Sequence, residues 1–177
     1  IRYAAFSSCF RREAGSYGKD TKGILRVHQF DKVEMFSFCR PDDSRDEHAL
    51  FLKMEEKLMQ ALKIPYRVVQ LCAGDLSRPS ATTIDIEAWL PGQNEGNGLY
   101  REVSSASNTT DFQSRRLNTK YRDSQNKVSF VHNVNGTGFA IGRIIIAIIE
   151  NYQTAEGFVN IPEALKPWMH GIEIIKR

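Results

Sequence analysis

The sequence has few of the residues and runs that build metal sites or membrane spans. Its three cysteines, Cys9, Cys39 and Cys72, are odd in number and widely spaced, and no Cys-x-x-Cys or Cys/His ligand spacing joins them. A zinc site therefore has little support, and the pattern suits free thiols in a reducing cytoplasm. The longest apolar run, residues 144–149, is far too short to cross a bilayer.

The chain also lacks a secretory signal, an internal repeat, a low-complexity segment and an initiating methionine, and the last of these indicates a fragment or a processed chain. Its 177 residues fit one domain, with ordinary contents of 41% hydrophobic and 25% charged residues. The net charge of +3 comes from 24 basic and 21 acidic residues, so bulk charge predicts no partner. Local basic clusters lie at 19–26 and 115–122.

Hydrophobic patterning predicts an antiparallel sheet with helices packed on it, which is an α+β fold. Strands are expected at 4–10, 24–39, 66–72, 82–90, 99–105 and 128–134. Within 82–90, Thr83, Asp85, Glu87 and Trp89 share one face and the residues between them share the other. A short basic helix is expected after residues 108–111 and an apolar helix over 139–152, buried at the centre of the domain.

A further helix is expected to begin at residues 42–44. Ser44 and Glu47 have the spacing of a capping box. An apolar stripe should face the core, and the charged residues between its members should stay in water. The stripe consists of Phe51, Met54, Leu58 and Leu62, and the charged residues are Lys53, Glu55, Glu56 and Lys57.

The first chemical candidate is the hairpin that residues 10–34 would form. Arg11 offers a guanidinium fork for phosphate oxygens. Glu13, two residues on, could accept a hydrogen bond from an adenine amine, and Phe30 on the returning strand could stack on the base. The alternative interpretation is a charged surface hairpin.

A second candidate covers residues 135–143, where glycines precede a helix start and would let a ligand approach the backbone. The pattern is neither the Walker loop nor the Rossmann fingerprint. Arg143 stands before six consecutive apolar positions, so an anionic or aromatic partner is expected, and a structural salt bridge is the alternative.

A third candidate covers residues 100–105. Alternation along a strand would place Glu102 and Ser104 on one face and Arg101 and Ser105 on the other. A carboxylate and a nearby hydroxyl at a strand end could hold Mg²⁺ on triphosphate oxygens. An edge-strand charge pair explains the same residues.

Taken together, the three segments resemble a known family. The string FRREAGSYGKDTKGILRVHQFDKVEMF looks like motif 2 of the class II aminoacyl-tRNA synthetases, and GFAIGR resembles their motif 3. With REVSSASNTTDFQSRRL and NGTGFAIGR, the chain is similar to the seryl-tRNA synthetases of bacterial or organellar type over essentially its whole length. This resemblance implies an antiparallel sheet flanked by helices, and a two-step reaction in which ATP and serine form seryl-adenylate before transfer to tRNA(Ser).

The resemblance also implies roles for particular residues. Arg11 and Arg143 would be catalytic, with Arg11 on the α-phosphate and Arg143 on the γ-phosphate and the adenine ring. Mg²⁺ would be managed through ATP by Glu102 and Ser105, and L-serine would contact Glu34, Asn135 and Thr137. The ATP-binding residues implied are Arg11, Arg12, Glu13, Val27, His28, Gln29, Phe30, Glu102, Val103, Ser104, Ser105 and Arg143.

The basic loop 15–23 would touch the acceptor end of tRNA(Ser). Three family features are missing from the sequence: the N-terminal tRNA-binding coiled coil, motif 1 of the dimer interface, and the Thr-x-Glu segment of the serine pocket. Residues 1–177 are therefore expected to be the C-terminal catalytic part of a cytoplasmic enzyme, inactive or weak alone and monomeric, whereas the full-length protein would be a homodimer. The alternatives are a shortened paralogue that activates an amino acid for a carrier protein, and a non-catalytic nucleotide- or RNA-binding module.

Overall fold

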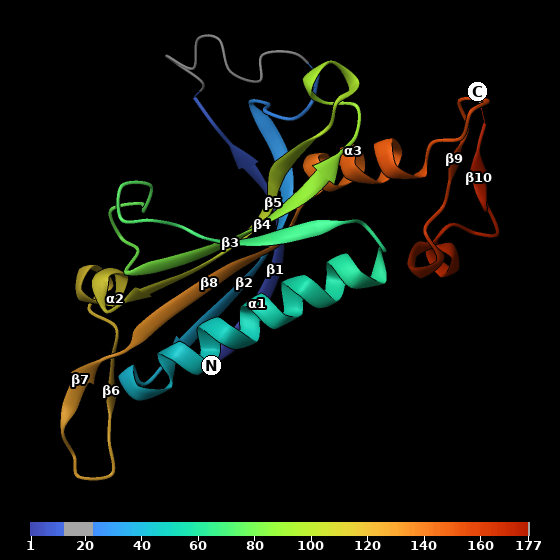
Figure 1. Cartoon of the computed structure of the whole chain (residues 1–177). Coiled ribbons are helices and arrows are strands. Elements are labelled where there is room, and N and C mark those ends of the chain that lie inside the picture. Colours follow the sequence, from blue (N-terminus) through green and yellow to red (C-terminus); the bar gives the residue numbers. More distant parts are fainter. Residues whose placement is uncertain (13–22, 177) are drawn as a thin grey trace.

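A computed structural model describes residues 1–12 and 23–176, and a six-stranded sheet forms their centre (Figure 1). Every neighbouring pair of strands in it is antiparallel, which confirms the expected α+β class. The strands lie in the order β1 (Arg2–Phe10), β2 (Gln29–Cys39), β8 (His132–Ala140), β5 (Leu99–Thr110), β4 (Thr82–Leu90) and β3 (Tyr66–Gln70).

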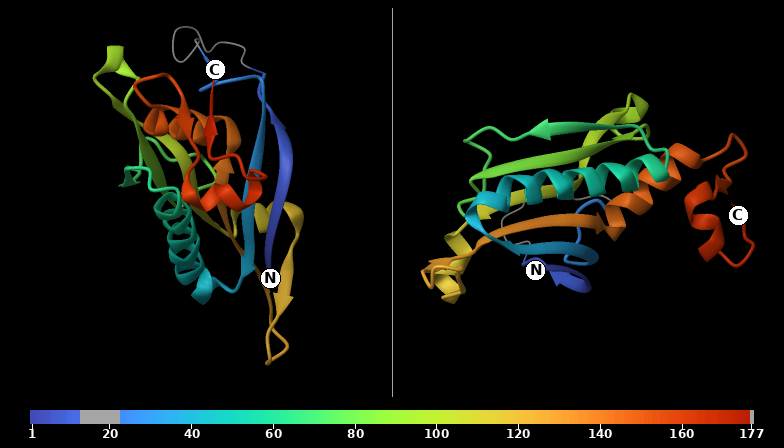
Figure 2. Two further views of the ribbon diagram at one scale, coloured as in Figure 1. Left: turned by 90° about the vertical axis from the view of Figure 1, so that its right-hand side faces the viewer. Right: turned by 90° about the horizontal axis from the view of Figure 1, so that it is seen from below.

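Two long helices, α1 (Ser44–Ala61) and α3 (Ile141–Tyr152), pack on one face of this sheet (Figure 2). A small hairpin of β6 (Lys120–Arg122) and β7 (Val128–Phe130) projects from the end of the sheet opposite α3 (Figure 1). The remaining elements are the helix α2 (Phe112–Leu117), the strands β9 (Val159–Asn160) and β10 (Ile174–Ile175), and the 3-10 helices η1 (Pro41–Asp43), η2 (Asn94–Gly96) and η3 (Glu163–Trp168).

The core lies between the sheet and the two helices. Ile86, Ala88 and Leu90 of β4 are completely buried there, as their period of two predicts. They pack with Met59 of α1 and Ile144 of α3. The polar side chains that alternate with them therefore point to the opposite face of the sheet, where Glu34, Glu102 and Thr137 of the other strands also lie.

Several strand boundaries differ from the sequence-based expectation. The strand expected at 24–39 begins only at Gln29, because Leu25 turns into the core, where it is 7% exposed. β5 continues to Thr110 instead of ending at residue 105. The strand expected at 128–134 is two strands, and β8 continues through Gly136 and Gly138, so these glycines belong to the sheet rather than to a helix start.

Helix α1 differs from the expectation in the face that it buries. Ser44 and Glu47 form no capping box, since the Ser44 hydroxyl donates to the carbonyl of Pro41 and Glu47 bonds to other elements. Phe51 and Leu62 of the expected stripe are buried, as predicted, but Met54 and Leu58 are 42% and 37% exposed. Glu55, expected in water, is 0% exposed. The buried face consists of Ser44, Glu47, His48, Phe51, Glu55 and Met59.

Helix α3 is not buried at the centre of the domain. It begins at Ile141 rather than 139, and Ile145 and Ile149 on its outer side are 41% and 42% exposed. Only one side of it, with Ile144 and Ala147, enters the core. None of the helices in the described ranges is long and apolar enough to cross a membrane.

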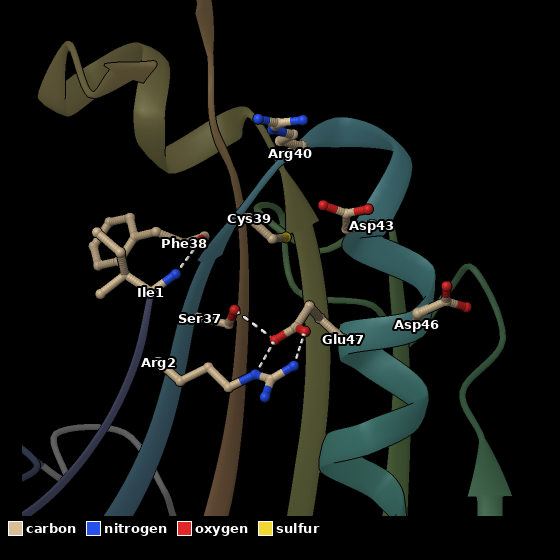
Figure 3. A pocket seen from close by; sticks show the side chains of 9 residues that line it. All are labelled: Ile1, Arg2, Ser37, Phe38, Cys39, Arg40, Asp43, Asp46 and Glu47. Carbon is tan, nitrogen blue, oxygen red and sulfur yellow. Dashed lines mark hydrogen bonds and ion pairs between the residues drawn. The ribbon is translucent and has the colours of Figure 1, made fainter. Parts of the chain in front are cut away.

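An ion pair ties the edge strand β1 to α1 (Figure 3). The Arg2 guanidinium donates to both carboxylate oxygens of Glu47, at 2.9 and 2.5 Å, and the Ser37 hydroxyl donates to Glu47 at 2.7 Å. The Glu47 side chain is 12% exposed and that of Arg2 is 59% exposed. These three residues hold β1, β2 and α1 together on the helix-covered side of the sheet.

Candidate active site

Two irregular positions in the sheet decide which side chains meet on its polar face. Gly138 is an extra residue of β8 where the register of β2 passes from Val33 to Glu34, and Val103 is an extra residue of β5 where the register of β4 passes from Ile86 to Glu87. An extra residue of this kind reverses the alternation of faces beyond it. These two bulges therefore determine which side chains face the site, and neither can be predicted from the alternation of apolar and polar residues.

The bulge at Val103 corrects the expected pairing of Glu102 with Ser104. Ser105 pairs with Asp85 and Glu102 pairs with Glu87, so Glu102 and Ser105 share the polar face. Ser104 instead points toward α1, where it is 1% exposed and its hydroxyl donates to the carbonyl of Thr137. Val103 is buried in the core.

Arg11 and Phe30 lie together at the end of the β1–β2 pair. The Arg11 guanidinium carbon is 4.6 Å from the centre of the Phe30 ring, a cation–π contact. Two hydrogen bonds to His28 fix the Arg11 backbone: its amide donates to the His28 carbonyl at 2.8 Å, and His28 Nδ1 donates to its carbonyl at 2.5 Å. Arg11, Val27, Phe30 and Arg143 line one small cavity.

Arg143 lies in the first turn of α3 and reaches back to β5. Its Nη1 donates to the backbone carbonyl of Glu102 at 2.7 Å and lies 3.2 Å from the Glu102 carboxylate, while its Nε donates to the carbonyl of Leu25 at 3.3 Å. A cation at a helix N-terminus opposes the helix dipole, so these acceptors offset an unfavourable position. Arg143 thus has an anionic partner, Glu102, and this ion pair is equally the structural salt bridge that the sequence left as the alternative.

The same face carries a group of carboxylates that includes Asp85, which the sequence interpretation placed on this face but did not select as a site residue. Asp85 is half-buried, and its Oδ1 has no hydrogen-bond partner. Burial, and then the neighbouring carboxylates of Glu102 and Glu87, raise the pKa of Asp85 to about 6. Asp85 could have been identified in the sequence as an acidic residue that alternates with apolar residues along a strand.

The predicted serine-contact residues also meet on this face. Glu34 pairs with Thr137 across β2 and β8, and the Thr137 hydroxyl donates to the Glu34 carboxylate at 3.4 Å. Asn135 lies two residues away, opposite Phe36. Lys32, which the sequence interpretation did not select, forms an ion pair with Glu34 at 2.5 Å.

The remaining predicted residues lie at the margin of the site. Arg12 is exposed where β1 has ended, and Gln29 is exposed opposite Phe10 at the end of the β1–β2 ladder. Glu13 lies outside the described residues, as does most of the basic loop 15–23, so the predicted adenine contact of Glu13 stays a prediction.

The donor set suits a divalent cation held jointly with phosphate oxygens better than a metal held by protein alone. In residues 1–12 and 23–176, no group of three or more His, Cys, Asp and Glu side chains could hold a metal ion. Glu102 and Ser105 nevertheless share a face with Asp85, whose pKa is raised by burial and then by the carboxylates of Glu102 and Glu87. Mg²⁺ needs few protein ligands when phosphates supply the others.

Comparison with known families identifies the fold and the group of proteins concerned. Residues 1–152 match the family described as the tRNA synthetase class II core domain (G, H, P, S and T). The curated serine–tRNA ligase of Desulforudis audaxviator is 51% identical over 177 residues, and that of Petrotoga mobilis is 53% identical over 169 residues. These matches cover 99% and 96% of this chain but only 41% and 39% of those proteins.

Solved structures give the same result. A seryl-tRNA synthetase from Pyrococcus horikoshii complexed with ATP is 49% identical, with a TM-score of 0.92 over 99% of this chain and 38% of that one. A cytoplasmic serine–tRNA ligase from Naegleria fowleri in complex with AMP is 47% identical, also with a TM-score of 0.92, over 99% of this chain and 41% of that one. The chain therefore spans about 40% of the length of the curated relatives described here.

Proposed function

We propose that this chain, which belongs to the class II aminoacyl-tRNA synthetases, is the C-terminal catalytic part of a serine–tRNA ligase and binds ATP on the polar face of its sheet. The observation that carries the proposal is the convergence of Arg11, Phe30 and Arg143 on one cavity beside Glu102. Two guanidinium groups, an aromatic ring and a carboxylate supply what phosphates, a purine and a phosphate-bound cation each need. The similarity to ATP-bound and AMP-bound relatives supports the same ligand.

The proposed reaction is the attack of the L-serine carboxylate on the α-phosphorus of ATP, which releases pyrophosphate and leaves seryl-adenylate. Arg11 would stabilise the negative charge that develops on the phosphoryl oxygens, and Arg143 would hold the γ-phosphate and the adenine ring. Mg²⁺ would be held by Glu102 and Ser105 together with ATP oxygens, and when bound it would neutralise phosphate charge.

Serine would be recognised by the pocket of Glu34, Thr137 and Asn135. Glu34 is already held by Lys32 and Thr137, so its carboxylate is fixed before a ligand arrives. A site whose buried polar groups hydrogen-bond to a substrate hydroxyl discriminates against alanine, because alanine would leave those groups unpaired. The adenylate would then pass to the acceptor end of tRNA(Ser) in a cytoplasmic, homodimeric full-length enzyme, whereas these 177 residues alone would be monomeric and weakly active.

Two measurements test this proposal. Calorimetry with ATP and Mg²⁺ should show binding to the folded chain, and Arg11→Ala should weaken it. A serine-dependent exchange of pyrophosphate into ATP should then be detectable and should be lost in Arg11→Ala. Exchange with another amino acid and none with serine would favour a paralogue that serves a different acceptor. A folded sample that binds no ATP would refute the proposed nucleotide site.

A further inference from the structure

A glutamate lies in the core directly behind the proposed serine pocket. Glu55 is in the middle of α1 and is 0% exposed. Neither of its carboxyl oxygens has a hydrogen-bond partner in the structure. A buried carboxyl group without partners is costly, so a purely structural core would favour an apolar side chain here.

The Glu55 carboxyl group occupies the space that a side chain at Gly136 would need. A Cβ atom built on Gly136 would lie 2.9 Å from Glu55 Oε1 and 3.1 Å from Phe51 Cδ2. Gly136 stands between Asn135 and Thr137, and alternation along β8 sends the side chains of those two residues to the polar face. The carboxyl group thus contacts the helix-covered side of the strand segment that presents two proposed serine contacts.

This segment is also where the central strands part. The backbone pairing of β5 with β8 ends at Ala106 and Gly136. Beyond that point the Ser104 hydroxyl donates to the Thr137 carbonyl at 2.5 Å and links the two strands by a side chain. The segment keeps its ladder with β2 but has no regular ladder with β5, so its position depends more on what packs behind it, and Glu55 packs there.

The charges around Glu55 favour its protonated form. Burial, and then the carboxylates of Glu34 and Asp85 on the other side of the sheet, raise the pKa of Glu55 to about 8. The Ser104 hydroxyl and the Thr137 backbone lie near enough to oppose this shift in part, although neither forms a regular hydrogen bond to a Glu55 carboxyl oxygen. On its own helix, the nearest buried titratable side chain toward the N-terminus is His48, whose Nε2 is bonded to the Ala106 carbonyl at 2.9 Å.

We propose that Glu55 is a positioning residue of the amino-acid pocket: its uncharged carboxyl group supports Gly136 from behind and so sets where Asn135 and Thr137 meet the substrate. When this group loses its proton, Glu34 repels the new charge and the carboxylate requires water or a hydrogen-bond donor. β8 then shifts at the segment where its pairing with β5 has ended. The substrate part of this inference rests on the proposed function, whereas the coupling of Glu55 to β8 does not.

Amide resonances of the ¹⁵N-labelled 177-residue chain test the coupling without any ligand. The signals of Asn135 and Thr137 should titrate together with a midpoint near pH 8, above the window of Asp85. Glu55→Gln, which keeps the shape and remains neutral, should abolish this titration. Glu56→Gln, a neighbouring substitution on the same helix, should leave it in place. Glu55→Met serves as a second neutral variant if the glutamine variant folds poorly.

Binding of L-serine in the presence of ATP and Mg²⁺ tests the consequence for the pocket. The serine affinity of the parent chain should fall by about 2- to 30-fold between pH 7 and pH 9, which is the range expected for coupling through packed side chains. The serine affinity of Glu55→Gln should not fall. ATP affinity should change little in either. A titration of Asn135 and Thr137 that persists in Glu55→Gln, or none in the parent, would overturn the inference. If the titration is seen but serine fails to bind at any pH, the proposed function fails while the coupling stands.

Discussion

Replacing Glu47 by glutamine should destabilise the chain at neutral pH and have no effect in acid. Glu47 lies on the buried face of α1 and accepts hydrogen bonds from Arg2 and Ser37 (Figure 3). The hydrogen bonds from Arg2 are the largest cause that lowers the pKa of Glu47 to about 2, from an ordinary value of 4.5. Glutamine keeps the size of the side chain but loses the charge that holds the guanidinium.

The size of the effect follows from the pKa shift. Lowering the pKa of Glu47 from 4.5 to about 2 is worth at most about 3 kcal/mol. The Arg2 side chain is 59% exposed, so water screens the pair, and we expect roughly 1–2 kcal/mol. Because the folded pKa is depressed, this stability is complete above about pH 4.5 and is lost as the pH falls toward 2.

Urea denaturation of the parent and Glu47→Gln, at several pH values from about 2.5 to 7, measures this difference. The two unfolding free energies should differ at pH 7 and converge at the acid end. Asp46→Asn, at the exposed neighbouring position, should match the parent throughout. A difference that stays constant with pH would show that packing, not the ion pair, is responsible. No difference at pH 7 would refute the stabilising role of the pair.

Two further predictions concern a turn and the nucleotide site. Gly98→Ala should cost roughly 3 kcal/mol or more in thermal or urea unfolding, because Gly98 has φ +79° and its Cβ would lie 2.0 Å from Trp89 Cζ2. Gly96→Ala, at φ +85° but in open space, should cost about 1 kcal/mol, and equal losses would contradict the predicted clash. Arg143→Ala should weaken ATP binding in calorimetry about tenfold or more, since it removes a guanidinium expected on the γ-phosphate. Arg115→Ala on α2 should not weaken it, and equal effects of both changes would argue for non-specific charge.

Strand β4 and the fold class could be predicted because they depend on local regularity. Ile86, Ala88 and Leu90 repeat every second residue, and all three are fully buried. The resemblance to a family indicated which residues form the site. It did not supply their arrangement, since the bulges at Val103 and Gly138 arise from pairing with distant strands. Glu102 and Ser105 meet only because of one of those bulges.

The face of α1 could not be predicted from apolar spacing. His48, Phe51, Glu55, Met59 and Leu62 follow a helical period and are all buried, but two of them are polar. His48 is bonded to the carbonyl of Ala106, 58 residues away, and Glu55 fills the space behind Gly136. Such distant partners cannot be recognised from the neighbouring sequence. A rule that places charged residues in water therefore identified Phe51 and Leu62 correctly but missed the burial of Glu55.

Helix α1 buries two glutamates, of which Glu47 is ionised and Glu55 protonated. The stability of the chain should therefore fall between pH 5 and pH 8, where many domains are most stable. Above about pH 5, Glu47 is ionised in both the folded and the unfolded state, so its contribution to stability no longer changes with pH. The raised pKa of Glu55 means that the folded state holds a proton that the unfolded state releases above about pH 4.5, so stability declines until about pH 8. Raising the pKa of Glu55 from 4.5 to about 8 sets an upper limit of about 5 kcal/mol, and Asp85 acts in the same direction at lower pH. Urea denaturation of Glu55→Gln should therefore show a much shallower decline over this range, and a decline equal to that of the parent would mean that Glu55 is already ionised at neutral pH.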